Sequence, residues 1–186
     1  KIKQKIYDFN QLPPSRQSKE APQMIKNIFG KTGENVWVEA PFHCDYGWNI
    51  EVGENFYSNY NLTILDVGKV TCGKNVQIAP NVSIYTAGHP VHPDSRNSGY
   101  EYGIPVTVGD NVWIGGNTVI LPGVTVGSNV VIGAGSVVSK DIPDNTIAAG
   151  NPCKVIREIT DEDRIYYFKK QKFDDEAWEE VKNKNK

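Results

Sequence analysis

The stretch VGDNVWIGGNTVILPGVTVGSNVVIGAGSVV, residues 108–138, decides the fold of this chain. A branched aliphatic residue recurs in it at every sixth position, and glycine follows that residue in four of the six copies. The position four residues after each branched residue is small or β-branched. The repeated branched positions are Val108, Ile114, Ile120, Val126, Ile132 and Val138.

A six-residue period excludes an amphipathic helix, because six residues make about 1.7 helical turns and the apolar position would circle the axis. Six residues suit one short strand and a sharp turn, which the glycines permit. Three such units would close a triangular coil of about 18 residues, and coils would stack at about 4.8 Å. A sandwich of short strands would instead show spacings of about 8–12 residues. The period therefore predicts a parallel β-helix with the branched residues inside, but not its handedness, since right-handed crossovers are the general rule.

Weaker copies of the period lie upstream, at Cys72, Ile78 and Ile84 and, fainter still, at Val52, Ser58 and Ile64. The period then breaks between Ile84 and Val108, where the chain reads TAGHPVHPDSRNSGYEYGIPV. A long polar loop inside a compact domain is usually functional. This loop carries His89, His92, Arg96 and Glu101.

Both ends of the chain lack the period. Residues Ser15 to Gly30 predict a helix with an apolar stripe that includes Ile25 and Ile28. After Arg157, one helical face could carry Ile165, Phe168 and Trp178. We expect both ends to cap the solenoid, because a solenoid needs its open ends covered. The expected organisation is a helical cap over residues 1–35, a β-helix over 36–158 with a catalytic loop at 85–107, and a helical extension over 159–186.

Composition limits the class of protein. The chain has 186 residues, of which 39% are apolar and 17 are glycine, which is ordinary for a single globular domain. The net charge of −2 gives no electrostatic reason for a nucleic acid or an anionic membrane as partner. No run approaches the ~18 apolar residues of a membrane span. Three cysteines are too few for a disulfide framework, so we expect a cytoplasmic protein.

The motifs resemble those of the maltose and galactoside O-acetyltransferases, a family of hexapeptide-repeat acyltransferases. The resemblance covers roughly residues 7 to 158. The segments that carry it are FHCDYGWNIEVGENFYSNYNLTILD, HPVHPDSRNSGYEYG, PVTVGDNVWIGG and VVIGAGSVVSKDIPDNTIAAGNPCKVIREI. It implies a left-handed parallel β-helix, a homotrimer with active sites between adjacent subunits, and acetyl transfer from acetyl-CoA to a sugar hydroxyl. It also implies an N-terminal helical segment at the acceptor site, which is absent before Lys1, so we expect either a truncated chain or a different cap.

A sugar hydroxyl needs a base, and histidine titrates near neutral pH. His43 lies in an early strand-like stretch, whereas His89 follows Gly88 at the end of a coil-forming segment. The resemblance makes the first histidine of HPVH the general base, so we expect this role for His89. Either Glu101 or a backbone carbonyl would orient its ring.

The transfer also needs a group that stabilises the oxyanion, and the backbone amides of Gly115-Gly116 are the candidates. Cys44 and Cys72 fall at or near inward positions, where cysteine behaves as a small apolar residue. We therefore predict direct transfer in a ternary complex, without an acyl-enzyme.

The resemblance also implies binding residues. Those for acetyl-CoA are Trp113, Gly116, Ala134, Ser139, Lys140, Lys154 and Arg157, and the cations among them suit phosphates. Those for the acceptor are Asp45, Tyr57 and Asn59. The LDV run at 65–67 resembles the maltose type and the GHPVH run the galactoside type, so the acceptor sugar stays open.

Two other functions are compatible with a β-helix. A metalloenzyme like the γ-class carbonic anhydrases would hold zinc with three histidines, but here two of the three share one loop, so we expect no metal. A non-catalytic solenoid, such as an ice-binding or scaffolding module, would show regular Thr or Ser ladders and no loop histidine.

Overall fold

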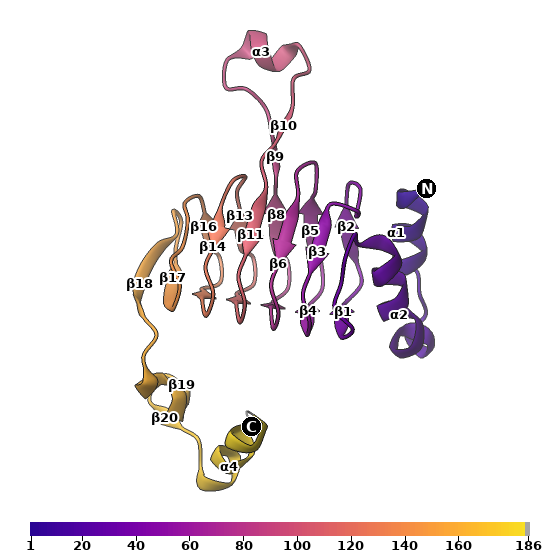
Figure 1. Cartoon of the computed structure of the whole chain (residues 1–186). Coiled ribbons are helices and arrows are strands. Elements are labelled where there is room, and N and C mark those ends of the chain that lie inside the picture. The colour runs from indigo at the N-terminus through magenta and orange to yellow at the C-terminus, as the bar shows by residue number, and fades with distance from the viewer. Residues whose placement is uncertain (185–186) are drawn as a thin grey trace.

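The computed structural model describes residues 1–184 as a three-sided prism with helices at its N-terminal end, a long loop on one edge and an extension at its C-terminal end (Figure 1). The prism is a parallel β-helix, as the six-residue period predicted, and it is left-handed, as the resemblance predicted. We call the three faces of the prism A, B and C. Each coil of the chain passes along face A, then face B, then face C, and the next coil begins again on face A.

Each face is a ladder of short strands. Face A consists of β1 (Val36–Val38), β4 (Phe56–Ser58), β7 (Gln77–Ile78), β12 (Trp113–Ile114), β15 (Val131–Ile132), β17 (Thr146–Ala149) and the antiparallel β18 (Lys154–Glu158). Face B consists of β2 (Phe42–Cys44), β5 (Leu62–Leu65), β8 (Ser83–Tyr85), β13 (Val119–Ile120) and β16 (Val137–Val138). Face C consists of β3 (Ile50–Val52), β6 (Val70–Cys72), β11 (Val106–Val108) and β14 (Thr125–Val126).

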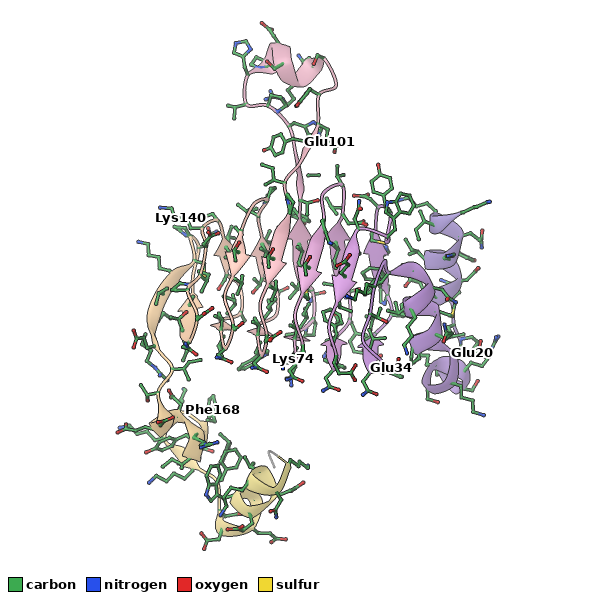
Figure 2. All side chains as sticks on the ribbon, viewed as in Figure 1. Glu20, Glu34, Lys74, Glu101, Lys140 and Phe168 are labelled. Carbon is green, nitrogen blue, oxygen red and sulfur yellow. The ribbon has the colours of Figure 1, made fainter. Side chains whose placement is uncertain are left out.

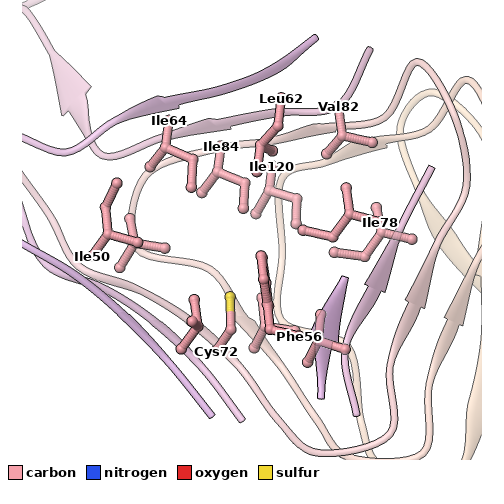
Figure 3. Close-up of a cluster of buried hydrophobic side chains, with 14 of the residues drawn as sticks. Ile50, Phe56, Leu62, Ile64, Cys72, Ile78, Val82, Ile84 and Ile120 are labelled. Carbon is pink, nitrogen blue, oxygen red and sulfur yellow. The ribbon is translucent and has the colours of Figure 1, made fainter. Parts of the chain in front are cut away.

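The repeated aliphatic residues fill the interior of the prism. All six branched positions of the 108–138 stretch are at most 1% exposed, and the upstream copies are buried as well. Figure 3 shows part of this column, including Phe56, Ile84 and Ile120. Each large aliphatic side chain removed from water contributes about 1.5–3 kcal/mol. The column makes the prism stiff, so residues on its edges keep fixed positions.

Coil length is not uniform. The register advances by 18 residues from Trp113 to Val131, as predicted, but by 20 from Tyr57 to Gln77. The two additional residues lie between faces B and C, because the inward positions Ile64 and Cys72 are eight residues apart instead of six. The long loop leaves the prism at the same B/C edge, between β8 and β11.

Asparagine makes the turns at the C/A edge, a feature that the sequence analysis missed. Five asparagines there have φ between +55° and +58°. Their side-chain amides form a ladder from coil to coil with N···O distances of 2.8–3.0 Å. The members are Asn55, Asn75, Asn111, Asn129 and Asn145. The glycines that follow the inward aliphatic residues of the 108–138 stretch serve close approach instead: a Cβ on Gly109 would lie 2.7 Å from the backbone nitrogen of Ser128.

Replacing Asn111 with alanine is expected to lower the free energy of unfolding by about 2 kcal/mol. Left-handed backbone costs alanine ~1–2 kcal/mol, and the two ladder hydrogen bonds add about 1 kcal/mol. Asn111→Gly keeps the backbone geometry and should lose only about 1 kcal/mol. Urea unfolding at one fixed protein concentration measures both values. An equal loss in the two variants would show that the left-handed turn contributes nothing.

Two helices cover the N-terminal end of the prism: α1 (Ile2–Asn10) and α2 (Pro14–Ile28). The predicted helix at Ser15–Gly30 corresponds to α2, but α1 was not predicted. Its buried residues Ile6 and Phe9 face the prism, and the Asn10 side chain exchanges two hydrogen bonds with the backbone of Phe42.

The prediction of a single helical face after Arg157 was wrong. Ile165 ends a 3-10 turn (Asp161–Ile165), Phe168 lies in β19 (Tyr166–Phe168), and Trp178 lies in α4 (Asp175–Lys184), beyond β20 (Gln171–Lys172). The extension does not cap the prism either, because α4 projects away from it and β18 covers the last coil (Figure 1). No helix within residues 1–184 is long and apolar enough to cross a membrane.

Candidate active site

The loop that leaves the B/C edge is built as a stalk and a head. Strand β9 (Ala87–Gly88) pairs antiparallel with β10 (Tyr102–Gly103) to form the stalk, and the short helix α3 (Pro93–Asn97) forms the head (Figure 1). Every residue from 91 to 105 is exposed. The loop therefore stands away from its own prism and holds its side chains in solvent.

His89 lies directly at the end of the stalk. Its Nδ1 is 2.9 Å from the backbone oxygen of Tyr100. A carbonyl only accepts hydrogen bonds, so Nδ1 carries the proton in the neutral ring and Nε2 is the basic nitrogen. Of the two orienting partners that the sequence left open, the backbone carbonyl occupies Nδ1.

Glu101 lies on the other side of the ring. Its Oε1 is 4.0 Å from His89 Nε2, and both side chains are about half exposed. The carboxylate is thus beside the nitrogen that would take up a proton. The sequence analysis considered Glu101 as the partner of the other ring nitrogen, so its position beside Nε2 differs from that expectation.

Asp45 lies at the same edge, in the turn that follows β2. Burial raises the pKa of its carboxyl, and the negative charges of Asp66 and Glu101 act in the same direction while Lys3 opposes them. Strand β2 and strand β8, which precedes the loop, belong to the same face, so Asp45 and the stalk lie on one B/C edge, two coils apart. The acceptor residue implied by the resemblance and the expected base therefore lie on one edge of the prism.

A buried carboxylate fixes this turn. Asp66 is fully buried and accepts hydrogen bonds from the backbone amides of Asp45, Tyr46 and Gly47 at 2.7–2.9 Å. Bonds from backbone N–H groups to an ionised oxygen are among the stronger ones in proteins. Asp66 therefore positions Asp45, a role that the sequence analysis missed because burial of a lone aspartate cannot be read from its neighbours.

The remaining expected residues fall into two groups on the prism. Ser139 and Lys140 follow β16 and share the B/C edge with His89; Figure 2 shows Lys140 on the same side as Glu101. The others lie on face A or at the A/B edge that follows it. These are Tyr57, Asn59, Trp113, Gly116 and Ala134, with Lys154 and Arg157 in β18 at the end of face A. A stiff prism cannot bring its own two edges together.

The oxyanion candidate was partly wrong. The Gly115 amide donates to the Ile132 carbonyl at 2.8 Å as part of the coil ladder, so it is not available to a substrate. The Gly116 amide donates to no group within residues 1–184. A Cβ at Gly116 would lie 3.1 Å from the carbonyl oxygen of Pro80 in the preceding coil. The backbone at Pro80 would have to move slightly to accept it.

Arg157 has a partner within its own chain. Its guanidinium forms two hydrogen bonds with the Asp163 carboxylate, at 2.7 and 2.8 Å, and this pairing lowers the pKa of Asp163 to about 2. An anionic ligand at Arg157 would have to compete with this carboxylate. Lys140 and Lys154 have no such ion pair among the described residues.

The cysteines are unsuited to nucleophilic catalysis. Cys44 and Cys72 are buried in the aliphatic column, which confirms their expected inward positions. Burial raises the pKa of both thiols to about 12, helped at Cys44 by the charges of Asp66 and Asp45, and burial also raises the pKa of Cys153. The thiolate is the reactive form, so these residues are inert at neutral pH.

We therefore expect the folded protein to show no rapidly reacting thiol at pH 8 toward an aromatic disulfide reagent. The same sample in guanidinium should release the signal of all 3 cysteines. One thiol that reacts fast in the folded state would contradict this result and reopen an acyl-enzyme route.

The structure bears on the two other functions considered from the sequence. Within residues 1–184 no three His, Cys, Asp or Glu side chains group as metal ligands do. His43 lies in β2 on face B, apart from the loop histidines. Face C does carry a short outward threonine ladder, Thr71, Thr107 and Thr125, but Glu51 continues it, paired with Lys69. The ladder is therefore too short and too charged for a regular threonine face.

Known proteins resemble this chain closely. The family described as bacterial transferase hexapeptide (six repeats) matches residues 105–140. A galactoside O-acetyltransferase of Escherichia coli strain K12 is 55% identical over 167 residues, 90% of this chain and 82% of that protein. The structure of a galactoside acetyltransferase in complex with coenzyme A superposes with a TM-score of 0.90 at 54% identity, covering 93% of this chain and 86% of that one. A maltose O-acetyltransferase from Clostridium difficile 630 gives 0.84 at 53% identity, covering 86% and 85%.

The hexad coils, the projecting loop and the histidine at the end of its stalk define a hexapeptide-repeat transferase built on a left-handed β-helix. The sequence identity with the galactoside O-acetyltransferase, over most of both chains, narrows the class to one family. The chain belongs to the galactoside and maltose O-acetyltransferase family, as the resemblance predicted, and it is an acetyltransferase.

Proposed function

We propose that this protein transfers an acetyl group from acetyl-CoA to a hydroxyl of a maltose-, glucose- or galactoside-like sugar, with His89 as general base. The observation that carries the proposal is the fixed tautomer of His89: the Tyr100 carbonyl holds Nδ1, and Nε2 is basic on an exposed loop. The coenzyme A complex of a 54% identical neighbour supports the donor.

The reaction balances with these groups alone. His89 Nε2 removes the hydroxyl proton as the sugar oxygen attacks the thioester carbonyl and forms the new C–O bond. The resulting oxyanion takes a hydrogen bond from a backbone amide, for which Gly116 is the candidate. Collapse breaks the C–S bond, and the coenzyme thiolate leaves with the proton from the His89 imidazolium. Glu101, 4.0 Å from Nε2, stabilises that imidazolium while it exists.

Direct transfer in a ternary complex is part of the proposal. Its support is the absence of a reactive nucleophile among the three cysteines, whose thiols are all buried with raised pKa values. The hydroxyl therefore attacks acetyl-CoA itself.

A homotrimer with shared active sites is the assembly that we propose. The support is the separation of the implied residues on two edges of one stiff prism: His89 and Asp45 at the B/C edge, Asn59 and Gly116 at the A/B edge. A ring of copies places the B/C edge of one beside the A/B edge of the next. The exposed loop of one copy then covers face A of its neighbour.

The coenzyme would lie along the C-terminal half of this junction, on Trp113, Gly116 and Ala134 of one copy and Ser139 and Lys140 of the other. Lys154 and Arg157 extend this group at the end of face A. Tyr57 and Asn59, in earlier coils, would hold the acceptor together with Asp45 of the neighbouring copy. The acetyl group and the sugar hydroxyl would then meet on face A between the strands of Tyr57 and Trp113, beside His89 of the neighbouring copy.

The test is a screen of maltose, glucose, galactosides and amino sugars with acetyl-CoA, monitored by release of free coenzyme thiol. We expect thiol release that depends on the sugar, and an O-acetyl product by mass spectrometry. Thiol release without an acceptor, or acetylation of amino groups only, would overturn the proposal.

A further inference from the structure

A cavity lies on face A beside Tyr57, at the N-terminal end of the prism. Its volume is about 420 Å³, and its lining includes two outward aromatic residues, Trp37 and Tyr57, the buried Phe56, and the polar residues Glu34, Asn35 and Asn55. Nothing in the proposed transfer uses Trp37, Asn35 or Asn55. Aromatic faces beside amide and carboxylate oxygens are the usual chemistry for binding a sugar ring, because the ring has apolar CH faces and hydroxyl edges.

The two aromatic residues form one platform. Trp37 in β1 and Tyr57 in β4 are register partners on neighbouring strands and point outward, since Val36, Val38, Phe56 and Ser58 are the buried residues of those strands. Neighbouring strands lie about 4.8 Å apart, so the two side chains stand side by side. Trp37 is also oriented, because its Nε1 donates to Glu39 at 2.8 Å.

The amide oxygens beside the platform are ready to accept hydrogen bonds. Asn55 begins the asparagine ladder: its Nδ2 donates to Asn75, and its own Oδ1 accepts nothing within residues 1–184. Asn35 donates its Nδ2 to Glu54, and its Oδ1 likewise accepts no hydrogen bond from the described residues. Glu54 also binds the backbone amides of Glu34 and Asn35, which fixes this turn.

The position of the cavity along the strands of face A indicates which part of a substrate it could bind. The outward residues of face A run in register from Trp37 through Tyr57 and Gln77 to Trp113. In the proposed function Trp113 holds the coenzyme and Tyr57 the acceptor. Trp37 therefore lies beyond the acceptor, on the side away from the donor. An acceptor with its reacting hydroxyl toward the thioester would extend over Trp37 if it is longer than one ring.

Resting on the proposed function, we propose that Trp37, Asn35 and Asn55 form a subsite for the second ring of a glycoside acceptor. The protein then selects disaccharides or glycosides over free monosaccharides. Trp37 stacks on the distal ring, and the two amide oxygens accept hydrogen bonds from its hydroxyls. Figure 2 shows Glu34 on the opposite side of the prism from Glu101, so this subsite serves the His89 of a neighbouring copy.

The test compares kcat/KM for glucose with maltose and for galactose with lactose, in the wild type, Trp37→Ala and Trp37→Phe. In the wild type we expect the disaccharide of one pair to be preferred. Trp37→Ala should raise KM for that disaccharide about tenfold, leave kcat unchanged and leave the monosaccharide unaffected, because the contact is made equally in the ground and transition states. Trp37→Phe keeps an aromatic face and should recover most of the preference.

Equal efficiencies for both members of each pair in the wild type would overturn the subsite while the acetyltransferase activity stands. So would a Trp37→Ala variant that loses mono- and disaccharide alike. If the wild type acetylates no sugar, the proposed function fails, and calorimetric titration with maltose and lactose decides the subsite separately. Binding that is lost in Trp37→Ala would support it, and no binding to the wild type would overturn it.

Discussion

Replacing His89 with alanine is expected to lower kcat by about 10²–10⁴, the usual contribution of a positioned general base. The ring makes one backbone hydrogen bond, from Nδ1 to the Tyr100 carbonyl, and is about half exposed on a loop outside the prism, so its removal should leave the prism intact. Because the sugar and acetyl-CoA do not require the imidazole to bind, KM for both should change little. Steady-state measurement of thiol release with a saturating acceptor gives the value.

His92 is the matched control for this experiment. It lies on the same loop, is exposed, and accepts a hydrogen bond from the Asp94 amide at the start of α3. His92→Ala should keep nearly the full rate. A His89→Ala protein with wild-type turnover, or an equal loss in both variants, would contradict the assignment of His89 as the base.

The fold was predictable because each face of a solenoid coil corresponds to one copy of a short sequence repeat. The branched residues at every sixth position must all face inward, and they do so without exception from Val108 to Val138. The role of Asn111 and its equivalents was harder to see, because asparagine at a turn reads as a generic loop signal. Its left-handed φ and its amide ladder become visible only when the coils stack.

The site was predictable in its residues but not in its arrangement. The loop histidine could be named from the sequence, whereas its tautomer depends on the Tyr100 carbonyl, eleven residues away across the stalk. Gly115 had the right chemistry for an oxyanion, but its amide is used by the coil ladder. The C-terminal segment misled because apolar spacing in a short polar stretch fits a helix and a hairpin equally well.

The separation of the expected residues on two edges leads to the second large effect, complementation between inactive chains. One variant is His89→Ala. The other carries Tyr57→Ala and Asn59→Ala, which remove the proposed acceptor contacts from face A and the A/B edge. Each protein alone is expected to be nearly inactive, for the first because the base is missing and for the second because the acceptor is not held.

Co-expressed in equal amounts and assembled at random, the two chains should recover about a quarter of the wild-type rate. A junction is intact when its B/C edge comes from the double variant and its A/B edge from His89→Ala, and this occurs with a chance of about one half times one half. Recovery must depend on co-assembly, so mixing the separately purified, already assembled proteins should give none until subunits exchange. A co-expressed sample no faster than the mean of its parents would mean that each chain completes its own site. The stiff prism makes that outcome hard to accommodate, because the two edges could meet in one chain only if the column of aliphatic residues between them were broken.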